Sequence, residues 1–173
     1  MAGDAFLIRD AGQTKQKQGT QVSAGAANAG DIVALDETGR LDPSVMPPGF
    51  GADTISVPAS EALVAGDFVN LHANAGAMNA RKADNSNGRQ ADGFVTAAVS
   101  SAATATVYPL DAANTGVSGL TPGSRYYLGT AGGVISSPLD AVAQVGTGKI
   151  DQYLGIARTA TELVTTDDGY VVL

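Results

Sequence analysis

The chain has 173 residues and no cysteine, which excludes a disulfide framework and a thiolate metal site. It also lacks any apolar run close to the roughly 20 residues that a membrane-spanning helix needs, so we expect no membrane partner. Residues 1–10 have neither the basic start nor the apolar core of a signal peptide. We therefore expect a protein that is made and used without secretion.

Positive charge is scarce as well. The chain has 10 Lys and Arg residues against 17 Asp and Glu residues, which gives a net charge of −7. No cluster of basic residues is longer than the pair Arg81-Lys82. Because phosphate binding depends on concentrated positive charge, we expect no free nucleic acid as a partner.

Residues typical of catalysis are few. The single histidine, His72, lies in a strand-like run, where a surface side chain is a simpler interpretation than a catalytic base. The run Gly146-Thr147-Gly148-Lys149 resembles the end of a phosphate loop. However, Ile150 replaces the Ser or Thr of that motif and Ala143 replaces its first glycine. A turn before a strand explains the run better.

Acidic residues are scattered, and the adjacent pairs are Asp36-Glu37 and Asp167-Asp168. Adjacent carboxylates in a turn do not converge in a cleft, as a general acid and base must. They also fall short of the six to eight oxygen ligands of calcium. We therefore expect no enzyme, no catalytic residue, no metal site and no cofactor.

Glycine and small or β-branched residues are abundant, and only 16% of the residues are charged. This composition favours an all-β protein. We expect a small β-barrel domain over 58–173, preceded by an extended N-terminal arm over 1–57. The strand-like runs of the domain are 68–72, 77–81, 93–99, 105–108, 125–128, 134–136, 153–157, 162–165 and 170–173.

The turn signals and the apolar positions of these runs define the expected core. Asn87-Gly88 and Asp168-Gly169 are typical of two-residue hairpin turns. The side chains expected in the core are Phe68, Leu71, Phe94, Val107, Leu128, Ile135, Leu154, Ile156 and Val164.

The domain contains a candidate internal repeat, 63–108 and 120–166. The segment 63–71 aligns with 120–128, and each begins with a Leu-x-x-Gly turn in which the glycine lies three residues after the leucine. Two such units facing each other can close a small barrel. The alternative is that unrelated β-hairpins look alike.

The N-terminal segment 1–57 becomes polar and low in complexity after its first apolar run. It is either a disordered tail or an arm that becomes ordered on a partner. The number of apolar residues favours the arm, because a solvated tail does not need them. The residues expected to contact the partner are Phe6, Leu7, Ile8, Ile32, Val33, Leu35, Leu41, Val45, Met46 and Pro47.

One part of this arm has a recognisable pattern, a glycine-bounded run of the form Ala-Leu-Asp-x-x-Gly-Arg-Leu-Asp-x-Ser-x-Met-Pro. It resembles a segment of structural proteins of tailed-phage virions, both capsid decoration (cement) proteins and head or tail fibre proteins. The domain is similar to the same proteins in the order of its Tyr-Tyr-Leu-Gly, Gly-Gly-Val-Ile and Leu-Gly-Ile-Ala runs. The matching arm residues are Ala34, Leu35, Asp36, Gly39, Arg40, Leu41, Asp42, Ser44, Met46 and Pro47.

The resemblance implies a cement protein that is made in the cytoplasm of a bacterial host and binds the outer surface of the phage head. Its partners would be the major capsid protein and, in a homotrimer, two further copies of the chain. The alternative is a tail, baseplate or head-fibre component that binds a host receptor. A separate carbohydrate-binding or lytic module is less well supported, because the chain has no tryptophan and no constellation of acids.

Overall fold

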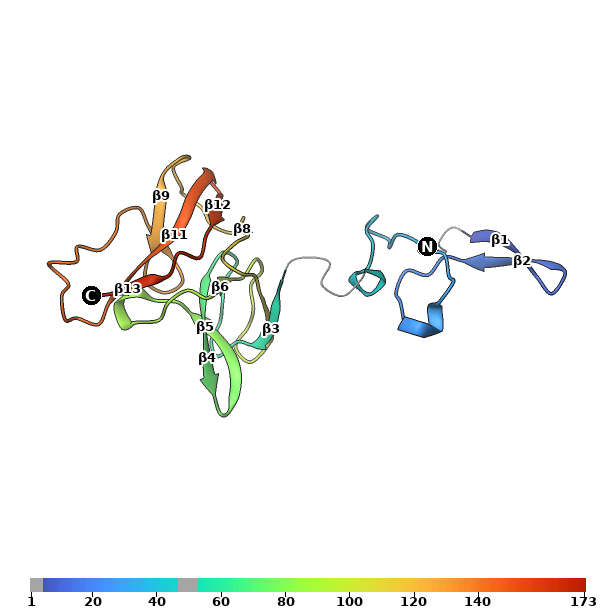
Figure 1. Ribbon diagram of the computed structural model, residues 1–173, viewed down its shortest axis with the longest axis horizontal. Coiled ribbons are helices and arrows are strands. Elements are labelled where there is room, and N and C mark those ends of the chain that lie inside the picture. The colour runs from blue at the N-terminus through green and yellow to red at the C-terminus, as the bar shows by residue number, and fades with distance from the viewer. Residues whose placement is uncertain (1–4, 47–52) are drawn as a thin grey trace. The chain divides into compact units, whose positions relative to one another are not determined.

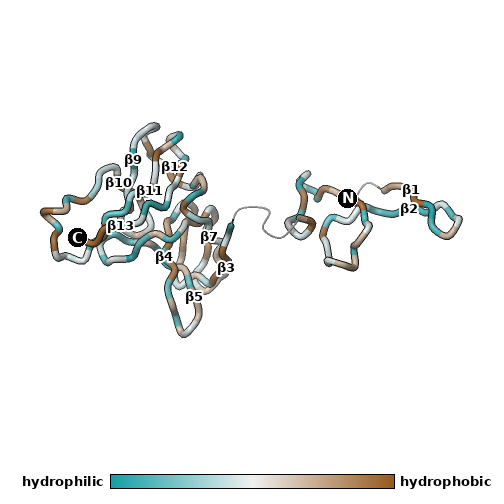
Figure 2. Tube along the Cα trace, viewed as in Figure 1, coloured by the Kyte–Doolittle hydropathy of each residue, from teal (hydrophilic) through white to brown (hydrophobic). Residues whose placement is uncertain are grey.

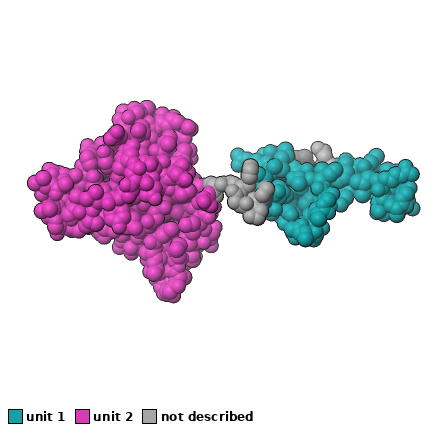
Figure 3. Space-filling view, viewed as in Figure 1, with its two compact units in different colours: residues 1–51 teal, residues 52–173 magenta. Residues whose placement is uncertain are grey.

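A computed structural model describes residues 5–46 and 53–173 of the chain (Figure 1). The chain divides into two compact units, Met1–Gly51 and Ala52–Leu173, called unit 1 and unit 2 below (Figure 3). The described residues form antiparallel strands with three short 3-10 helices, so the protein is all-β, as the composition predicts. None of these helices has the length and hydropathy that crossing a bilayer requires.

Unit 1 begins with a hairpin in place of the extended chain that we expected. Strand β1 (Ala5–Asp10) pairs with β2 (Gln13–Gln18) through a two-residue turn, Ala11-Gly12. Both turn residues have positive φ, 49° and 80°, as a type I′ turn requires. Two 3-10 helices follow, η1 (Gly25–Asn28) and η2 (Pro43–Val45).

The hairpin was missed because β2 has no alternation of polar and apolar residues. All six of its residues are exposed, so neither face has to be apolar. Figure 2 shows the contrast between the hydrophobic β1 and the hydrophilic β2.

Unit 2 contains the remaining strands, arranged in three sheets. The largest has the order β10-β9-β11-β12-β8, with β13 paired to the first part of β11; the other two are β5-β4-β6 and β3-β7. A third 3-10 helix, η3 (Asn85–Asn87), follows β5. The strands are β3 (Ile55–Pro58), β4 (Phe68–Asn74), β5 (Ala77–Lys82), β6 (Gly93–Phe94), β7 (Thr104–Val107), β8 (Ala113–Asn114), β9 (Arg125–Leu128), β10 (Val134–Ile135), β11 (Ile150–Thr159), β12 (Glu162–Thr165) and β13 (Tyr170–Val172).

These sheets do not close into one barrel within the described part of the chain, so the expected barrel is not confirmed. The sheets are joined by isolated bridges, such as Phe94 with Tyr108 and Ala59 with Ala80. Strand β6 has only two residues, although the sequence indicates a strand over 93–99. A strand of this length offers too few backbone groups to continue a barrel wall.

The core of unit 2 has two parts. The larger one joins residues of both candidate repeats, among them Phe68, Phe94, Leu128 and Leu154, and the two phenylalanine rings are 6.1 Å apart. Buried amides connect the same regions: the Gln152 side chain accepts from the backbone N–H of Ala91 (2.7 Å) and donates to its carbonyl (2.9 Å). The smaller cluster contains Val57, Ala59, Leu63, Val69, Ala80, Val95, Ala105 and Val107.

Strand β3 lies in this smaller cluster, because Val57 is buried there and β3 pairs with β7. The chain therefore divides between Gly51 and Ala52, several residues before the expected boundary after 57. The sequence of β3 is too short, and too close to the prolines of the preceding segment, to be recognised as part of the domain.

Two of the expected core residues, Ile156 and Val164, are in fact exposed, at 44% and 45%. The reason is an irregular register in β11 around Gly155. Leu154 points into the core. Because β11 has one extra residue at this point, Ile156 lies on the solvent-exposed face of the sheet, beside its partner Val164 in β12. Of the other expected core residues, Leu71 and Ile135 are half-buried and the remainder are buried.

The expected turns are not two-residue hairpin turns. Asn87-Gly88 ends η3 in a longer loop that the antiparallel bridge of Asp84 with Arg89 closes. Asp168-Gly169 lies between β12 and β13, which do not pair with each other. The two-residue turn of β4 and β5 is Ala75-Gly76, with φ of 49° and 83°. Alanine at the first position is unusual for such a turn, so it gives no recognisable signal.

The two candidate repeats share a strand order. In the first, a hairpin pairs with a later strand as β5-β4-β6, and in the second as β10-β9-β11. Gly66 and Gly123, which align in the sequence, both have positive φ. This similarity is what duplication would produce, and the repeat remains a prediction.

Candidate interaction surface

Apolar side chains of unit 1 lie at its surface. Along β1, Phe6 and Ile8 are half-buried on one face, while Leu7 on the other face is 75% exposed. Among residues 5–42 and 44–46 of unit 1, no residue is buried. The described part of this unit therefore lacks a hydrophobic core of its own.

Backbone hydrogen bonds hold the next apolar residues in place. The N–H of Thr20 donates to the carbonyl of Ile32 (2.9 Å), and the N–H of Ala34 donates to the carbonyl of Thr20 (3.0 Å). Further along, the Gln21 side chain donates to the carbonyl of Leu35 (2.8 Å). These bonds fix the backbone, while the side chains of Ile32, Val33 and Leu35 remain exposed.

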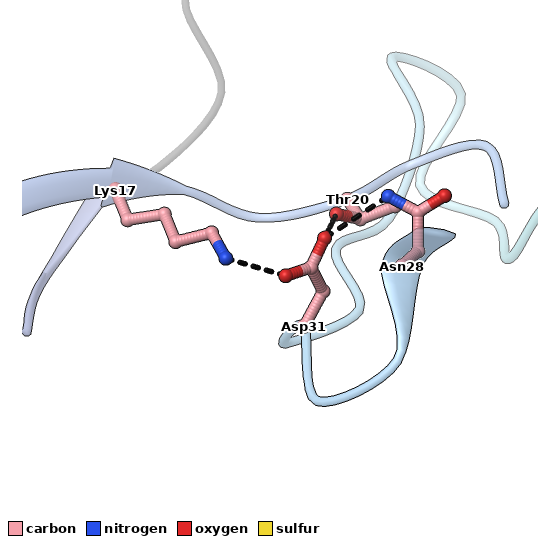
Figure 4. Close-up of polar contacts among 4 residues, drawn as sticks. All are labelled: Lys17, Thr20, Asn28 and Asp31. Carbon is pink, nitrogen blue, oxygen red and sulfur yellow. Dashed lines mark hydrogen bonds and ion pairs between the residues drawn. The ribbon is translucent and has the colours of Figure 1, made fainter. Parts of the chain in front are cut away.

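A polar cluster links β2 to the loop that carries Ile32, Val33 and Leu35 (Figure 4). The carboxylate of Asp31 forms an ion pair with Lys17 and accepts hydrogen bonds from Thr20 Oγ1 (2.8 Å) and Asn28 Nδ2 (3.0 Å). The hydrogen bonds from Lys17, Asn28 and Thr20 hold the pKa of Asp31 far below its usual range. The cluster is thus built around a charged carboxylate.

The run that resembles phage structural proteins forms a tight turn. Asp36 Oδ1 accepts from the backbone N–H of Thr38 (2.8 Å), from its hydroxyl (2.7 Å) and from the N–H of Arg40 (2.9 Å). Gly39 supplies the positive φ, 76°, at the closure of the turn. Hydrogen bonds from Arg40 and Thr38 lower the pKa of Asp36.

A second turn follows directly. Asp42 accepts from the N–H of Ser44 (2.9 Å), and hydrogen bonds from Ser44 lower the pKa of Asp42. The Ser44 hydroxyl in turn accepts from the N–H of Ser23 (2.8 Å). The polar residues of the run therefore build turns.

The structure brings some of the expected contact residues together. Val33 and Val45 line a small pocket of about 110 Å³, together with Thr20, Ser23, Asn28, Asp31 and Ser44. A typical ligand site is several times larger. Leu41 is exposed, Val45 and Met46 are half-buried, and Pro47 lies outside the described residues. Phe6, Leu7 and Ile8 do not line this pocket.

The sequence analysis did not identify Lys17, Thr20, Asn28 and Asp31 as a cluster. Their spacing is irregular because they come from a strand, a loop and the end of a 3-10 helix. The pair Asn28 and Asp31, three residues apart around Gly30, is the one local signal of a turn that side chains close.

Elsewhere, His72 has ordinary structural partners. Its Nε2 lies 2.8 Å from the Ser60 hydroxyl and its Nδ1 lies 3.1 Å from the carbonyl of Ala73. Across residues 5–46 and 53–173, His, Asp and Glu side chains form no group of three or more that is suited to a metal ion.

No protein-family model and no curated protein matches the chain. Among solved structures, it is similar to the N base of the head fibre gp8.5 of bacteriophage phi29, with 14% sequence identity and a TM-score of 0.44. That similarity covers 67% of this chain and 95% of the fibre base. A likeness of this degree establishes neither the family nor the function of the chain.

Proposed function

We propose that the protein is a structural component of a tailed-phage virion and acts as a capsid decoration, or cement, protein. The observation that carries the proposal is the surface of unit 1. It carries exposed leucine, isoleucine and valine side chains, and none of residues 5–42 and 44–46 is buried. Such a unit gains most of its stability when a partner covers it.

The energetics favour docking. Each fully covered valine, leucine or isoleucine side chain contributes roughly 1.5–3 kcal/mol. Hydrogen bonds already hold the loop that carries Ile32, Val33 and Leu35, so less conformational entropy is lost on binding. In the proposal, the partner that covers this surface is the major capsid protein.

Unit 2 has the opposite character. It has two buried clusters and buried amide hydrogen bonds, so it does not depend on a partner for its core. In a cement protein, such a unit lies across neighbouring capsid subunits and adds contacts that have to break before the shell opens. A protein that binds only the intact lattice stabilises it by mass action, and three linked copies would add avidity.

The docking claim is tested by cosedimentation with phage heads that lack the protein. Leu35, 53% exposed, is changed to Asp, because an unpaired carboxylate in an apolar interface is costly. Met78→Asp is the matched control, since Met78 is 54% exposed in unit 2. We expect Leu35→Asp to abolish binding and Met78→Asp to preserve it. Equal binding by both variants would reject unit 1 as the attachment surface.

A different set of results would favour the alternative function, that of a tail, baseplate or head-fibre component. If heads without the protein are as stable as complete heads but no longer adsorb to cells, then the protein is a fibre or receptor-binding component. Binding to purified tails or baseplates in place of heads would also favour that alternative.

A further inference from the structure

We infer that Asn87 is a site of spontaneous covalent modification, at which the side-chain amide is lost and the adjacent backbone is rearranged. Asn87 and Gly88 lie at the end of η3, in the loop that the bridge of Asp84 with Arg89 closes. Asparagine is one of the thermolabile residues of proteins, and its reaction depends on the residue that follows it. The inference goes beyond the proposed function, because it concerns the chemistry of the free chain.

The nucleophile of this reaction is the backbone nitrogen of Gly88. The nitrogen gives its proton to hydroxide and attacks Cγ of Asn87, so that an N–Cγ bond forms and the Cγ–Nδ2 bond breaks. The leaving amide nitrogen takes up a proton and departs as ammonia, and a succinimide ring remains. Water then opens the ring at one of its two carbonyl groups, which gives either aspartate or isoaspartate. The reaction consumes water alone and needs no oxidant or reductant.

The structure leaves this nucleophile accessible. Gly88 has no side chain to shield its nitrogen, and its φ of 73° is a conformation that favours glycine. Within residues 5–46 and 53–173, neither the N–H of Gly88 nor the side chain of Asn87 forms a hydrogen bond. Asn87 is exposed, and its own N–H donates to the carbonyl of Asp84 at a long 3.4 Å. The amide can therefore turn toward the Gly88 nitrogen at little cost.

Asn85, two residues earlier in the same loop, is protected. It is 5% exposed, and its Nδ2 donates to the carbonyl of Leu128 (2.7 Å). The next backbone nitrogen is occupied as well, because the N–H of Ser86 donates to the Asp84 carboxylate (2.9 Å). Both bonds have to break before the Asn85 amide can meet that nitrogen, and a buried amide without a partner is costly. The same loop thus contains a reactive and an unreactive asparagine.

The remaining asparagines are protected by hydrogen bonds or by the residue that follows them. Those whose side-chain amides donate to other groups of the chain are Asn28, Asn70, Asn79 and Asn114. Asn74 is the closest comparison, because it is exposed and its amide has no hydrogen bond in the described part of the chain. It precedes Ala75, whose methyl group hinders approach to the backbone nitrogen. Asn87 combines exposure, a free amide and a following glycine.

The modification acts on the fold through this loop. Isoaspartate in place of Asn87 adds a carbon atom to the backbone between Asp84 and Arg89, whose N–H and carbonyl groups pair at 2.8 and 3.1 Å. The same loop is held to the turn after β9, because Asp84 Oδ2 accepts from the N–H of Ala131 (3.1 Å). Either product also adds one negative charge to the net charge of −7. We expect the modified chain to unfold at a lower temperature and to bind an anion exchanger more tightly.

The test is incubation of the purified full chain at mildly alkaline pH, followed by digestion and mass spectrometry. We expect the gain in mass that replacement of NH2 by OH produces to accumulate at Asn87, at a rate proportional to the hydroxide concentration. Asn87→Ser removes the amide and should eliminate the reaction. Ala75→Gly is the matched variant, because it places a glycine after Asn74 at a φ of 49°, which glycine tolerates. In that variant Asn74 should become a second site.

The inference is overturned if Asn87 keeps its amide in the folded chain but loses it in chain unfolded by urea, because the loop would then protect it. Modification of Asn74 in the wild type as fast as that of Asn87 would also overturn it. If Asn74 stays intact in Ala75→Gly, the selectivity ascribed to Gly88 is wrong. Because every measurement uses the isolated chain, the outcome is independent of the attachment proposed for unit 1.

Discussion

Gly155 determines which side chains of β11 reach the core and which reach the surface. Its φ of 146° and the proximity of the Val164 carbonyl leave no room for a side chain. We predict that Gly155→Ala lowers the free energy of unfolding by about 1–3 kcal/mol, the usual cost of such backbone strain. Urea unfolding measures it, and a stability equal to that of the wild type would contradict the description of the bulge.

Leu154 and Ile156 lie on either side of this glycine and should respond differently to truncation. Leu154 is fully buried, so Leu154→Ala should cost roughly 2–5 kcal/mol. Ile156 is exposed, so Ile156→Ala should change the stability of the monomer by less than about 0.5 kcal/mol. Unfolding of both variants at low protein concentration makes the comparison. Equal losses would place both side chains on one face of the sheet.

At the scale of elements, the ion pair of Lys17 with Asp31 connects β2 to the loop that carries Ile32 and Val33. The folded state lowers the pKa of Asp31, so the carboxylate contributes stability above its ordinary pKa of 3.8. That contribution is lost as the pH falls below this value and approaches the lower, folded-state pKa.

We therefore predict that the loop around Asp31 loosens in acid and that Asp31→Asn loosens it already at pH 7. Amide hydrogen exchange at Thr20 and Ala34 measures this, because their N–H groups bond across the loop. Asp10→Asn, which removes the exposed ion pair with Lys15 in the same unit, is the control. Exchange that is equal in Asp31→Asn and the control would show that the cluster does not hold the loop.

The elements also show what the sequence can and cannot predict. Strands with one buried face, such as β9 and β12, are predicted with their observed bounds, because burial imposes an alternation of residues. Strands β1 and β2 were missed because β2 is exposed on both faces. The exposed arm residues were identified by their apolar character alone, whereas the Asp31 cluster depends on contacts between segments that only the folded chain brings together. The division of unit 2 into separate sheets likewise depends on contacts between distant segments, which the sequence pattern does not show.

At the scale of the whole molecule, the two units differ in their need for a partner. Unit 2 contains both buried clusters, so a fragment of residues 52–173 should fold and unfold cooperatively. Calorimetry of the fragment and of the full chain should give the same main transition. A fragment that begins at residue 59 removes β3 and with it Val57, so it should be less stable. Loss of folding in the 52–173 fragment would mean that unit 1 contributes to the core.

The measurement that tests the proposed function most directly is the temperature at which phage heads release their DNA. Heads that lack the protein should assemble but release DNA at a lower temperature than complete heads, and adding the full chain should restore the higher temperature. The 52–173 fragment and Leu35→Asp should fail to restore it, because both impair the apolar surface of unit 1. Heads whose release temperature is the same with and without the protein would contradict the proposed cement function.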